Sequence, residues 1–535
     1  MAEQDNLADL IIYLKSLGFE GSILEATLRK EYERFDAFMY IDHYIAFGND
    51  LLRYELHLVY DRQFNAYRLD QYEVFYRKQV NIEHKIINGI DTQELERLMA
   101  EVDWHYYFFQ EMNDLPTEED LSGIFEKMEA LSDENNPNSE GLKIKSRLIY
   151  KYWPSGNWND EANELQDIYE TSKVFKAEHL GIANATLAYH ITSGNFGNLH
   201  ELISRTGIEA YPGFDLKGLL AVYLSKNSER FDLSFSCQQE DGIIDFHIPV
   251  CKQEGRYEAE YMELTFTRFP EIKHGVFSGI DTANLKEQMK LIDWEHGDLY
   301  YLDENEDVIL YPYVQTIKDS IDRLNADTQT QHIGEYLQIK YWGESVMEMY
   351  VNEETWQMKD WEKTRQRFTL DEDTRTIGNL MQGRPVHSSM LSISDAPDER
   401  WCVIDATSVA DNGLNPIKYI EGISRGQIET MVSMLSVDGT VWTGDIVRSI
   451  QQGEKVPVDI NGINGAEQVI VSVPANPAEQ RLEVTTPEGR SIPFNFKMDP
   501  DWCADQISTR LEQQEGKKDL RTKKNQRGKT RRKGM

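Results

Sequence analysis

The chain has 535 residues, of which 40% are hydrophobic and 11% aromatic, so it can build several packed cores and is not a disordered polypeptide. Its net charge is −36, spread unevenly: the last twenty residues carry +9 and the other 515 carry −45. No stretch reaches the roughly 18 apolar residues of a membrane span, and the acidic start, MAEQDNLADL, is unlike a secretory signal. We therefore expect a cytoplasmic protein that makes no membrane contact.

Four cysteines are too few for a disulfide framework in a chain of this length. They lie far apart and form no CxxC pair, which argues against a zinc site and against a redox pair. The sequence also lacks the phosphate-binding loop, the dinucleotide fingerprint, the zinc-protease helix and the nucleophile elbow. We expect no metal and no cofactor. The four positions are Cys237, Cys251, Cys402 and Cys503.

A tandem duplication organises the first two thirds of the chain. GIDTQELERLMAEVDW at 89–104 recurs as GIDTANLKEQMKLIDW at 279–294, with eight of sixteen positions identical. The match extends without a gap over 54–104 and 244–294, where fourteen of 51 positions are identical. A period of 190 residues indicates duplicated domains, because solenoid repeats are only about 20–50 residues long. We define repeat A as residues 1–190 and repeat B as residues 195–365.

Both repeats have the same pattern of expected elements. A short helix comes first, at 8–18 in repeat A and at 198–207 in repeat B. Three runs of alternating apolar and polar residues follow, which predict an antiparallel β-meander. The helix that begins with GIDT comes next, and a further helix follows it. The runs cover 35–47, 51–61 and 66–78 in repeat A, and 231–237, 243–251 and 256–268 in repeat B.

The GIDT helix is explained by capping and packing. Asp91 is expected to be the N-cap, with Glu94 completing a capping box and Ile90 packing on Leu95 as a hydrophobic staple. Trp104 is expected to close the helix and cover the core. An Asp at a helix start is ordinarily a cap, so we do not interpret Asp91 as catalytic. Repeat B retains Ile280, Asp281, Leu285 and Trp294, with Asn284 in place of Glu94.

An acid–histidine pair recurs on the second strand of each meander. Glu55 and His57 in repeat A correspond to Asp245 and His247 in repeat B. Residues two apart on a strand face the same side, so each pair is expected on the polar face of its sheet. Such a pair could orient a general base or contribute to a metal site. The alternative is a charge pair or a hydrogen bond on the sheet face, which we favour because no nucleophile or third ligand accompanies it.

The C-terminal part has a different pattern. Residues 368–510 alternate short helices with strands that are separated by Pro and Gly turns, which predicts a small α+β domain. Residues 515–535 have almost no apolar side chains, so we expect a disordered basic tail. The tail could neutralise several phosphates of a nucleic acid without base specificity, or it could fold back on the acidic body. Its candidate contacts are Lys523, Lys524, Arg527, Lys529, Arg531, Arg532 and Lys533.

The C-terminal domain resembles uncharacterised proteins carried on conjugative transposons of Bacteroides-type bacteria. The resemblance rests on LMQGRPVH at 380–387, WCVID at 401–405, NGLNPIKYI at 412–420, IVRSIQQGEKVPV at 446–458 and the closing KTRRKGM. It covers roughly 150 residues and includes no catalytic motif. It implies a mobile-element setting and no particular activity.

These features predict an α+β protein that is not an enzyme. The expected function is that of an accessory protein of a mobile element, in which two acidic repeats bind a protein partner and the basic tail contacts nucleic acid. One alternative is a hydrolase that uses the recurring acid–histidine face. Another is an acidic decoy that binds DNA-binding proteins by imitating the charge of phosphates.

Overall fold

The computed structural model describes residues 2–48, 50–113, 120–132, 139–176, 183–253, 255–343, 345–392, 400–433, 443–460, 469–486 and 491–492. Its helices and antiparallel sheets confirm the α+β class. The described residues fall into two compact units. One comprises residues up to Leu202 together with Asp215–Phe231 and Val250–Ala259, and the other comprises Ile203–Phe214, Asp232–Pro249 and the residues from Glu260 onward. No helix in the described ranges is long and apolar enough to cross a membrane.

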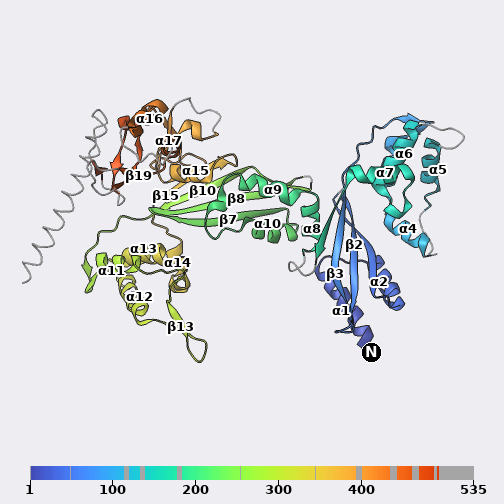
Figure 1. The fold of residues 1–535 in the computed structure, drawn as a ribbon, viewed down its shortest axis with the longest axis horizontal. Coiled ribbons are helices and arrows are strands. Elements are labelled where there is room, and N and C mark those ends of the chain that lie inside the picture. Colours follow the sequence, from blue (N-terminus) through green and yellow to red (C-terminus); the bar gives the residue numbers. More distant parts are fainter. Residues whose placement is uncertain are drawn as a thin grey trace, which may run out of the picture. The chain divides into compact units, whose positions relative to one another are not determined.

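The expected meander of repeat A is present, with a fourth strand beside it. The order is β1-β2-β3-β6, and every neighbouring pair is antiparallel. β6 was not predicted, because the chain reaches it only after a long helical segment. The helices that begin the repeat and the helix after β6 lie beside this sheet (Figure 1). The bounds are β1 Phe38–Phe47, β2 Asp50–Asp61, β3 Ala66–Arg77, β6 Glu170–Lys176, α1 Ala2–Ser16, α2 Ser22–Arg34 and α8 Ala185–Thr192.

Alternation along these strands separates a core face from an outer face. On β2, Leu52, Tyr54, Leu56 and Leu58 are fully buried and pack with α1 and α2, while the residues between them are partly exposed. This is the two-residue period of a half-buried sheet. Glu55 and His57 therefore lie on the outer face, as the sequence predicts.

A helical lobe is inserted between β3 and β6 and has its own core, which includes Leu95, Met99 and Trp104. Figure 1 shows helices α4–α7 gathered into this group. The elements are β4 Ile86–Ile87, β5 Ile90–Asp91, α3 Thr92–Ala100, α4 Trp104–Met112, α5 Ser122–Leu131, α6 Ser139–Tyr152, η1 Ser155–Asn157 and α7 Asp160–Tyr169.

Repeat B has the same plan, with one change in strand pairing. The predicted third run is two strands, and the sheet order is β15-β10-β8-β7 with β9 beside β8. His57 lies opposite Gln71 in repeat A, whereas His247 lies opposite Glu263, which aligns with Glu73. The pairing is thus shifted by two residues, and an even shift keeps each side chain on its original face. The elements are α9 Asn195–Ser204, η3 Ile208–Ala210, α10 Leu216–Ser225, β7 Arg230–Gln239, β8 Gly242–Gln253, β9 Arg256–Ala259, β10 Tyr261–Arg268 and β15 Lys363–Thr369.

The helical lobe of repeat B lies between β10 and β15 in the chain, as that of repeat A lies between β3 and β6. Its core includes Leu285, Met289, Trp294 and Trp342. The elements are β11 Val276–Phe277, β12 Ile280–Asp281, α11 Thr282–Lys290, β13 Tyr300–Leu302, β14 Val308–Leu310, α12 Pro312–Asn325, α13 Gln331–Trp342, η4 Val346–Tyr350 and α14 Glu353–Trp356.

The C-terminal region contains short helices and strands, as its sequence predicts, with two differences in the described residues. β18 was not predicted and pairs with β17, and the helix predicted up to Val458 ends at Gln451 and is followed by strand β19. A core around Trp401 and Ile428 joins helices α16 and α17 to the strands. The elements are α15 Thr374–Met381, β16 Val386–His387, η5 Ser388–Met390, β17 Trp401–Ile404, β18 Ile417–Ile420, α16 Arg425–Ser433, α17 Thr443–Gln451, β19 Val456–Ile460, β20 Val469–Val473, β21 Ala475–Asn476, η6 Pro477–Glu479, β22 Arg481–Leu482, β23 Val484–Thr485 and β24 Ser491–Ile492.

Candidate functional site

The recurring GIDT motif is a helix start in both repeats. The Asp91 carboxylate accepts hydrogen bonds from the backbone N–H groups of Gln93 and Glu94, and Asp281 caps α11 in the same way. The expected capping box is absent, because the Glu94 carboxylate is bound by Arg97 at 2.8 and 2.9 Å. Asp91 therefore acts as the cap without help from Glu94.

Two further identities of the motif have structural roles that the sequence did not reveal. Thr92 is fully buried, and its hydroxyl accepts a hydrogen bond from the backbone N–H of Lys85 at 2.9 Å. Asp103 caps the next helix by accepting from the backbone N–H of Tyr106 at 3.0 Å. Trp104 begins α4 rather than closing α3, and its indole N–H donates to the carbonyl of Met99.

The glycine of the motif completes a tight hairpin turn. Asn88 and Gly89 have positive φ angles of 51° and 81°, as the two central residues of a type I′ turn require. Ser278 and Gly279 repeat this geometry in repeat B. All eight identities of the motif therefore have a role in capping, turning or packing, which supports the architectural interpretation.

Glu55 and His57 form a hydrogen-bonded pair on the outer face of the sheet in repeat A. His57 Nε2 lies 2.7 Å from Glu55 Oε1, and His57 Nδ1 lies 3.0 Å from the Gln71 amide nitrogen. A carboxylate accepts and an amide NH₂ donates, so the ring is held with its proton on Nε2. Both ring nitrogens are occupied by neighbours, which leaves neither available as a general base or as a metal ligand in this geometry.

The corresponding residues of repeat B are arranged differently. Asp245 accepts a hydrogen bond from Ser236 at 2.6 Å. His247 lies 3.1 Å from Ser234 Oγ through Nδ1 and 3.6 Å from Asp232 through Nε2. The acid and the histidine thus lie on the equivalent strand in both repeats. In repeat B, however, they contact residues of the neighbouring strand β7 and not each other.

The remaining sequence candidates lie elsewhere. The basic residues between Lys523 and Lys533 are outside the described residues, as is Cys503. Among the residues that the structure describes, no three His, Cys, Asp or Glu side chains are grouped to hold a metal ion.

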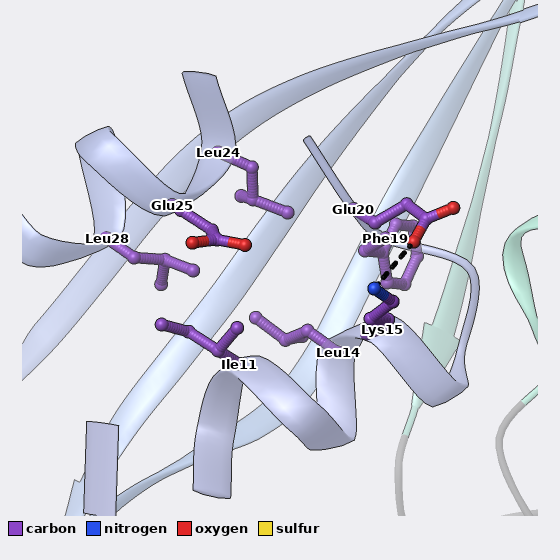
Figure 2. Close-up of a pocket in the computed structure, with 8 residues that line it drawn as sticks. All are labelled: Ile11, Leu14, Lys15, Phe19, Glu20, Leu24, Glu25 and Leu28. Carbon is purple, nitrogen blue, oxygen red and sulfur yellow. Dashed lines mark ion pairs between the residues drawn. The ribbon is translucent and has the colours of Figure 1, made fainter. Parts of the chain in front are cut away.

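A small hollow lies between α1 and α2 (Figure 2). Its volume of about 10 Å³ has room for roughly one water molecule. Apolar side chains line most of it, and an ion pair between Lys15 and Glu20 lies at one side. The hollow is too small for a substrate, so we interpret it as an imperfection in the packing of the two helices. The lining residues are Ile11, Leu14, Lys15, Phe19, Glu20, Leu24, Glu25 and Leu28.

A polar cluster in the helical lobe of repeat A was not predicted. Glu96 on α3 lies 2.8 Å from His84 Nε2 and accepts hydrogen bonds from Lys151 at 2.6 Å and from the hydroxyl of Tyr152 at 3.1 Å. Burial alone would raise the pKa of this carboxyl, but the bonds from Lys151 and Tyr152 hold it below its usual value. The glutamate is a negatively charged centre that three donors surround.

A signal for this cluster was present in the sequence. Position 96 is Glu in repeat A, and the aligned position 286 is Lys, which is a charge reversal inside a well-matched motif. Lys151 and Tyr152 belong to the KYW triplet that recurs at 340–342. Only the fold, however, brings α3 and the end of α6 together.

A second buried acid lies in the C-terminal region. Glu372 is 2% exposed, and its Oε1 accepts a hydrogen bond from the backbone N–H of Ser392 at 2.7 Å. Burial, supported by the charges of Asp371 and Asp373, raises the pKa of Glu372 to about 7. The thiol of Cys402 is fully buried, and burial together with Glu372 raises its pKa to about 11. A protonated thiol is a poor nucleophile, so this pair is not a ready catalytic site.

Comparisons with known proteins found no matching family model, no similar curated protein and no similar solved structure.

Proposed function

We propose that the protein is a non-enzymatic accessory protein of a bacterial mobile element, and that it binds a protein partner through the outer face of the first sheet. The observation that carries the proposal is a pair of exposed aromatic side chains on this face. Phe38 and Tyr40 on β1 are 58% and 63% exposed. Aromatic side chains supply much of the binding energy at protein interfaces. The mobile-element setting rests on the resemblance of the C-terminal domain.

The polar groups beside these aromatics are held in place by one another. Arg53 lies 3.0 Å from Asp42 and 3.3 Å from Glu55, and Glu55 is in turn bound to His57. The ring of Tyr40 lies edge-on to that of His57, with centroids 4.8 Å apart. A rigid mixture of aromatic and charged groups of this kind suits the recognition of a protein surface. The hydrogen bonds on both nitrogens of His57 favour this role over the hydrolase alternative.

The two repeats do not present equivalent surfaces. His247 has Ser234 beside it, where His57 has Tyr40. Phe38 and Tyr40 thus have small or polar counterparts on the outer face of repeat B. We therefore propose that the partner binds repeat A once, and not both repeats alike.

Replacing Phe38 with Asp and Tyr40 with Ser should weaken partner binding about 10- to 100-fold, because two interface aromatics are lost while the core face of β1 is unchanged. Affinity purification from the native host, followed by quantitative mass spectrometry, would measure the effect. Ile12→Ser is the matched control, since Ile12 is 67% exposed on α1, a helix that covers the opposite face of the sheet. Equal recovery of all proteins by wild type and the double variant would contradict the proposed surface.

The basic tail gives a separate test. We propose that it contacts nucleic acid, so the full chain should be retained on immobilised DNA at low salt and released as salt rises. Seven cations would give a slope of log affinity against log salt of at most about −6. Deleting residues 516–535 should abolish retention. If the full chain is not retained even at low salt, the tail does not bind nucleic acid.

A further inference from the structure

The helical lobe of repeat B contains positive charge where repeat A has the carboxylate of Glu96. Lys286 on α11 stands in the aligned position, so the local charge differs by two units between the repeats. The surrounding donors are conserved in kind: His274, Lys340 and Tyr341 correspond to His84, Lys151 and Tyr152. The cluster of repeat B therefore has the donors of repeat A without their acceptor.

The structure anchors the histidine of this set in the same way in both repeats. His274 Nδ1 lies 3.2 Å from the hydroxyl of Thr282, as His84 Nδ1 lies 3.3 Å from that of Thr92. This shared anchor directs the Nε2 atom of each ring in the same way relative to the motif helix. In repeat A that atom meets Glu96 at 2.8 Å. Helices α11 and α13, which carry Lys286 and Lys340, are in contact within the lobe (Figure 1).

Both lysines gather around one aromatic ring. The Lys286 and Lys340 ammonium groups lie 5.5 and 5.7 Å from the ring centre of the buried Tyr336. Lys340 also donates to the carbonyl of Glu240 at 3.3 Å. Burial and then the charge of Lys286 lower the pKa of Lys340, and the same two causes lower that of His274. The charge of Lys286 thus disfavours the protonated forms of Lys340 and His274, and a bound anion would offset this effect.

The carboxylates near the cluster have other partners. Glu240 and Asp241 lie 3.0 and 3.7 Å from Lys455, and Asp281 caps α11. Among the described residues, Lys286 has no ion-pair partner. The charges of Asp241 and Glu240 favour the protonated form of Lys340, but each does so by less than Lys286 opposes it, so neither takes the place that Glu96 has in repeat A.

We propose that repeat B binds a phosphate monoester between Lys286, Lys340 and His274, in the place that the Glu96 carboxylate occupies in repeat A. The charge difference of two units favours a dianion over a carboxylate, and a phosphate monoester carries about −1.5 to −2 at pH 7. Lysine is a common phosphate ligand that acts as a point charge. This site uses none of the residues assigned to the proposed protein-binding face or to the basic tail.

The test is calorimetric titration of the full-length protein with phenyl phosphate, inorganic phosphate and acetate at constant ionic strength. Both phosphates should bind at one site with a Kd of about 1 mM or lower, and acetate at least about tenfold more weakly. Lys286→Glu, which restores the residue of repeat A, should weaken phosphate binding by tenfold or more. Gln288→Glu adds a negative charge at an exposed position on the opposite side of α11 from Lys286 and should leave binding within about twofold.

Three results would overturn the proposal: no binding by up to about 10 mM phosphate, equal affinity of wild type and Lys286→Glu, or equal losses in Lys286→Glu and Gln288→Glu. Binding of acetate as tight as that of phosphate would contradict the proposed preference of the site for a dianion. Lys286→Gln provides a second variant that removes the charge without adding a carboxylate, and it should also weaken binding. The reciprocal Glu96→Lys variant, when folded, should raise the number of bound phosphates from one to two.

Discussion

Replacing Arg77 with methionine should lower the free energy of unfolding of repeat A by about 3–5 kcal/mol, because it breaks a buried ion pair on one side only. The Arg77 side chain is 5% exposed, and its Nε lies 3.6 Å from the Glu170 carboxylate, which is 4% exposed. Its guanidinium also donates to the carbonyls of Tyr150 and Trp153 at 3.1 and 2.8 Å. Arg77 ends β3, so it ties the sheet to the helical lobe.

Urea denaturation, monitored by hydrogen exchange of the β3 and α6 peptides, would measure the loss of unfolding free energy in Arg77→Met. Arg97→Met is the matched control, since Arg97 is an exposed partner of Glu94 and Glu101 and solvent screens these ion pairs, so its removal should cost far less than that of Arg77. Adding Glu170→Gln to Arg77→Met should recover part of the loss, because it removes the unpaired buried charge. If Arg77→Met costs no more than Arg97→Met, the buried pair does not hold the lobe to the sheet.

The sequence predicted the elements whose signals are local. The three strands of repeat A follow from alternation over ten or more residues, and the caps at Asp91 and Asp281 follow from a polar side chain just before an apolar stripe. The residues that are identical in the two GIDT motifs were predicted to have structural roles. The structure adds the roles of Thr92 and Asp103, which the sequence did not explain. Each of these features depends on residues only a few positions apart.

The features that were missed depend on distant parts of the chain. β6 is a short strand whose partner β3 ends more than ninety residues earlier, and the intervening lobe has no strand signal that would predict the return. The shifted pairing of His247 arises because the hairpin of repeat B joins Gln253 to Arg256, whereas that of repeat A joins Asp61 to Ala66. The Glu96 cluster forms because the fold places the end of α6, with Lys151 and Tyr152, beside α3. A gapless alignment carries none of this information.

The stability of the C-terminal region should fall as pH rises toward 7, and Glu372→Gln should remove this dependence. Glu372 has a folded-state pKa of about 7, above the ordinary value of about 4.5 for the unfolded chain. Below pH 4.5 the carboxyl is protonated in both states, so it adds no pH-dependent cost. Between 4.5 and 7 the unfolded state loses its proton first and is stabilised relative to the folded state by about 1.4 kcal/mol per pH unit.

Above pH 7 Glu372 is ionised in both the folded and the unfolded state. The stability lost through its ionisation then stays constant at about 3 kcal/mol. Glutamine retains the oxygen that accepts the hydrogen bond from Ser392 and carries no charge to bury. Glu372→Gln should therefore exceed wild type in stability at pH 8 by up to this amount and match it near pH 4.5. Hydrogen exchange of peptides from 374–392, measured from pH 5 to pH 8 and corrected for intrinsic exchange, would follow the opening of this region.

The control for this experiment is Asp371→Asn, which removes a neighbouring carboxylate that is exposed to solvent. It should retain most of the pH dependence, because burial, the main cause of the raised pKa of Glu372, is unchanged. A wild-type profile that is flat between pH 5 and 8 would mean that Glu372 ionises in the folded state at its ordinary pKa. The hydrogen bond from Ser392 and local solvation would then outweigh the burial of the carboxyl.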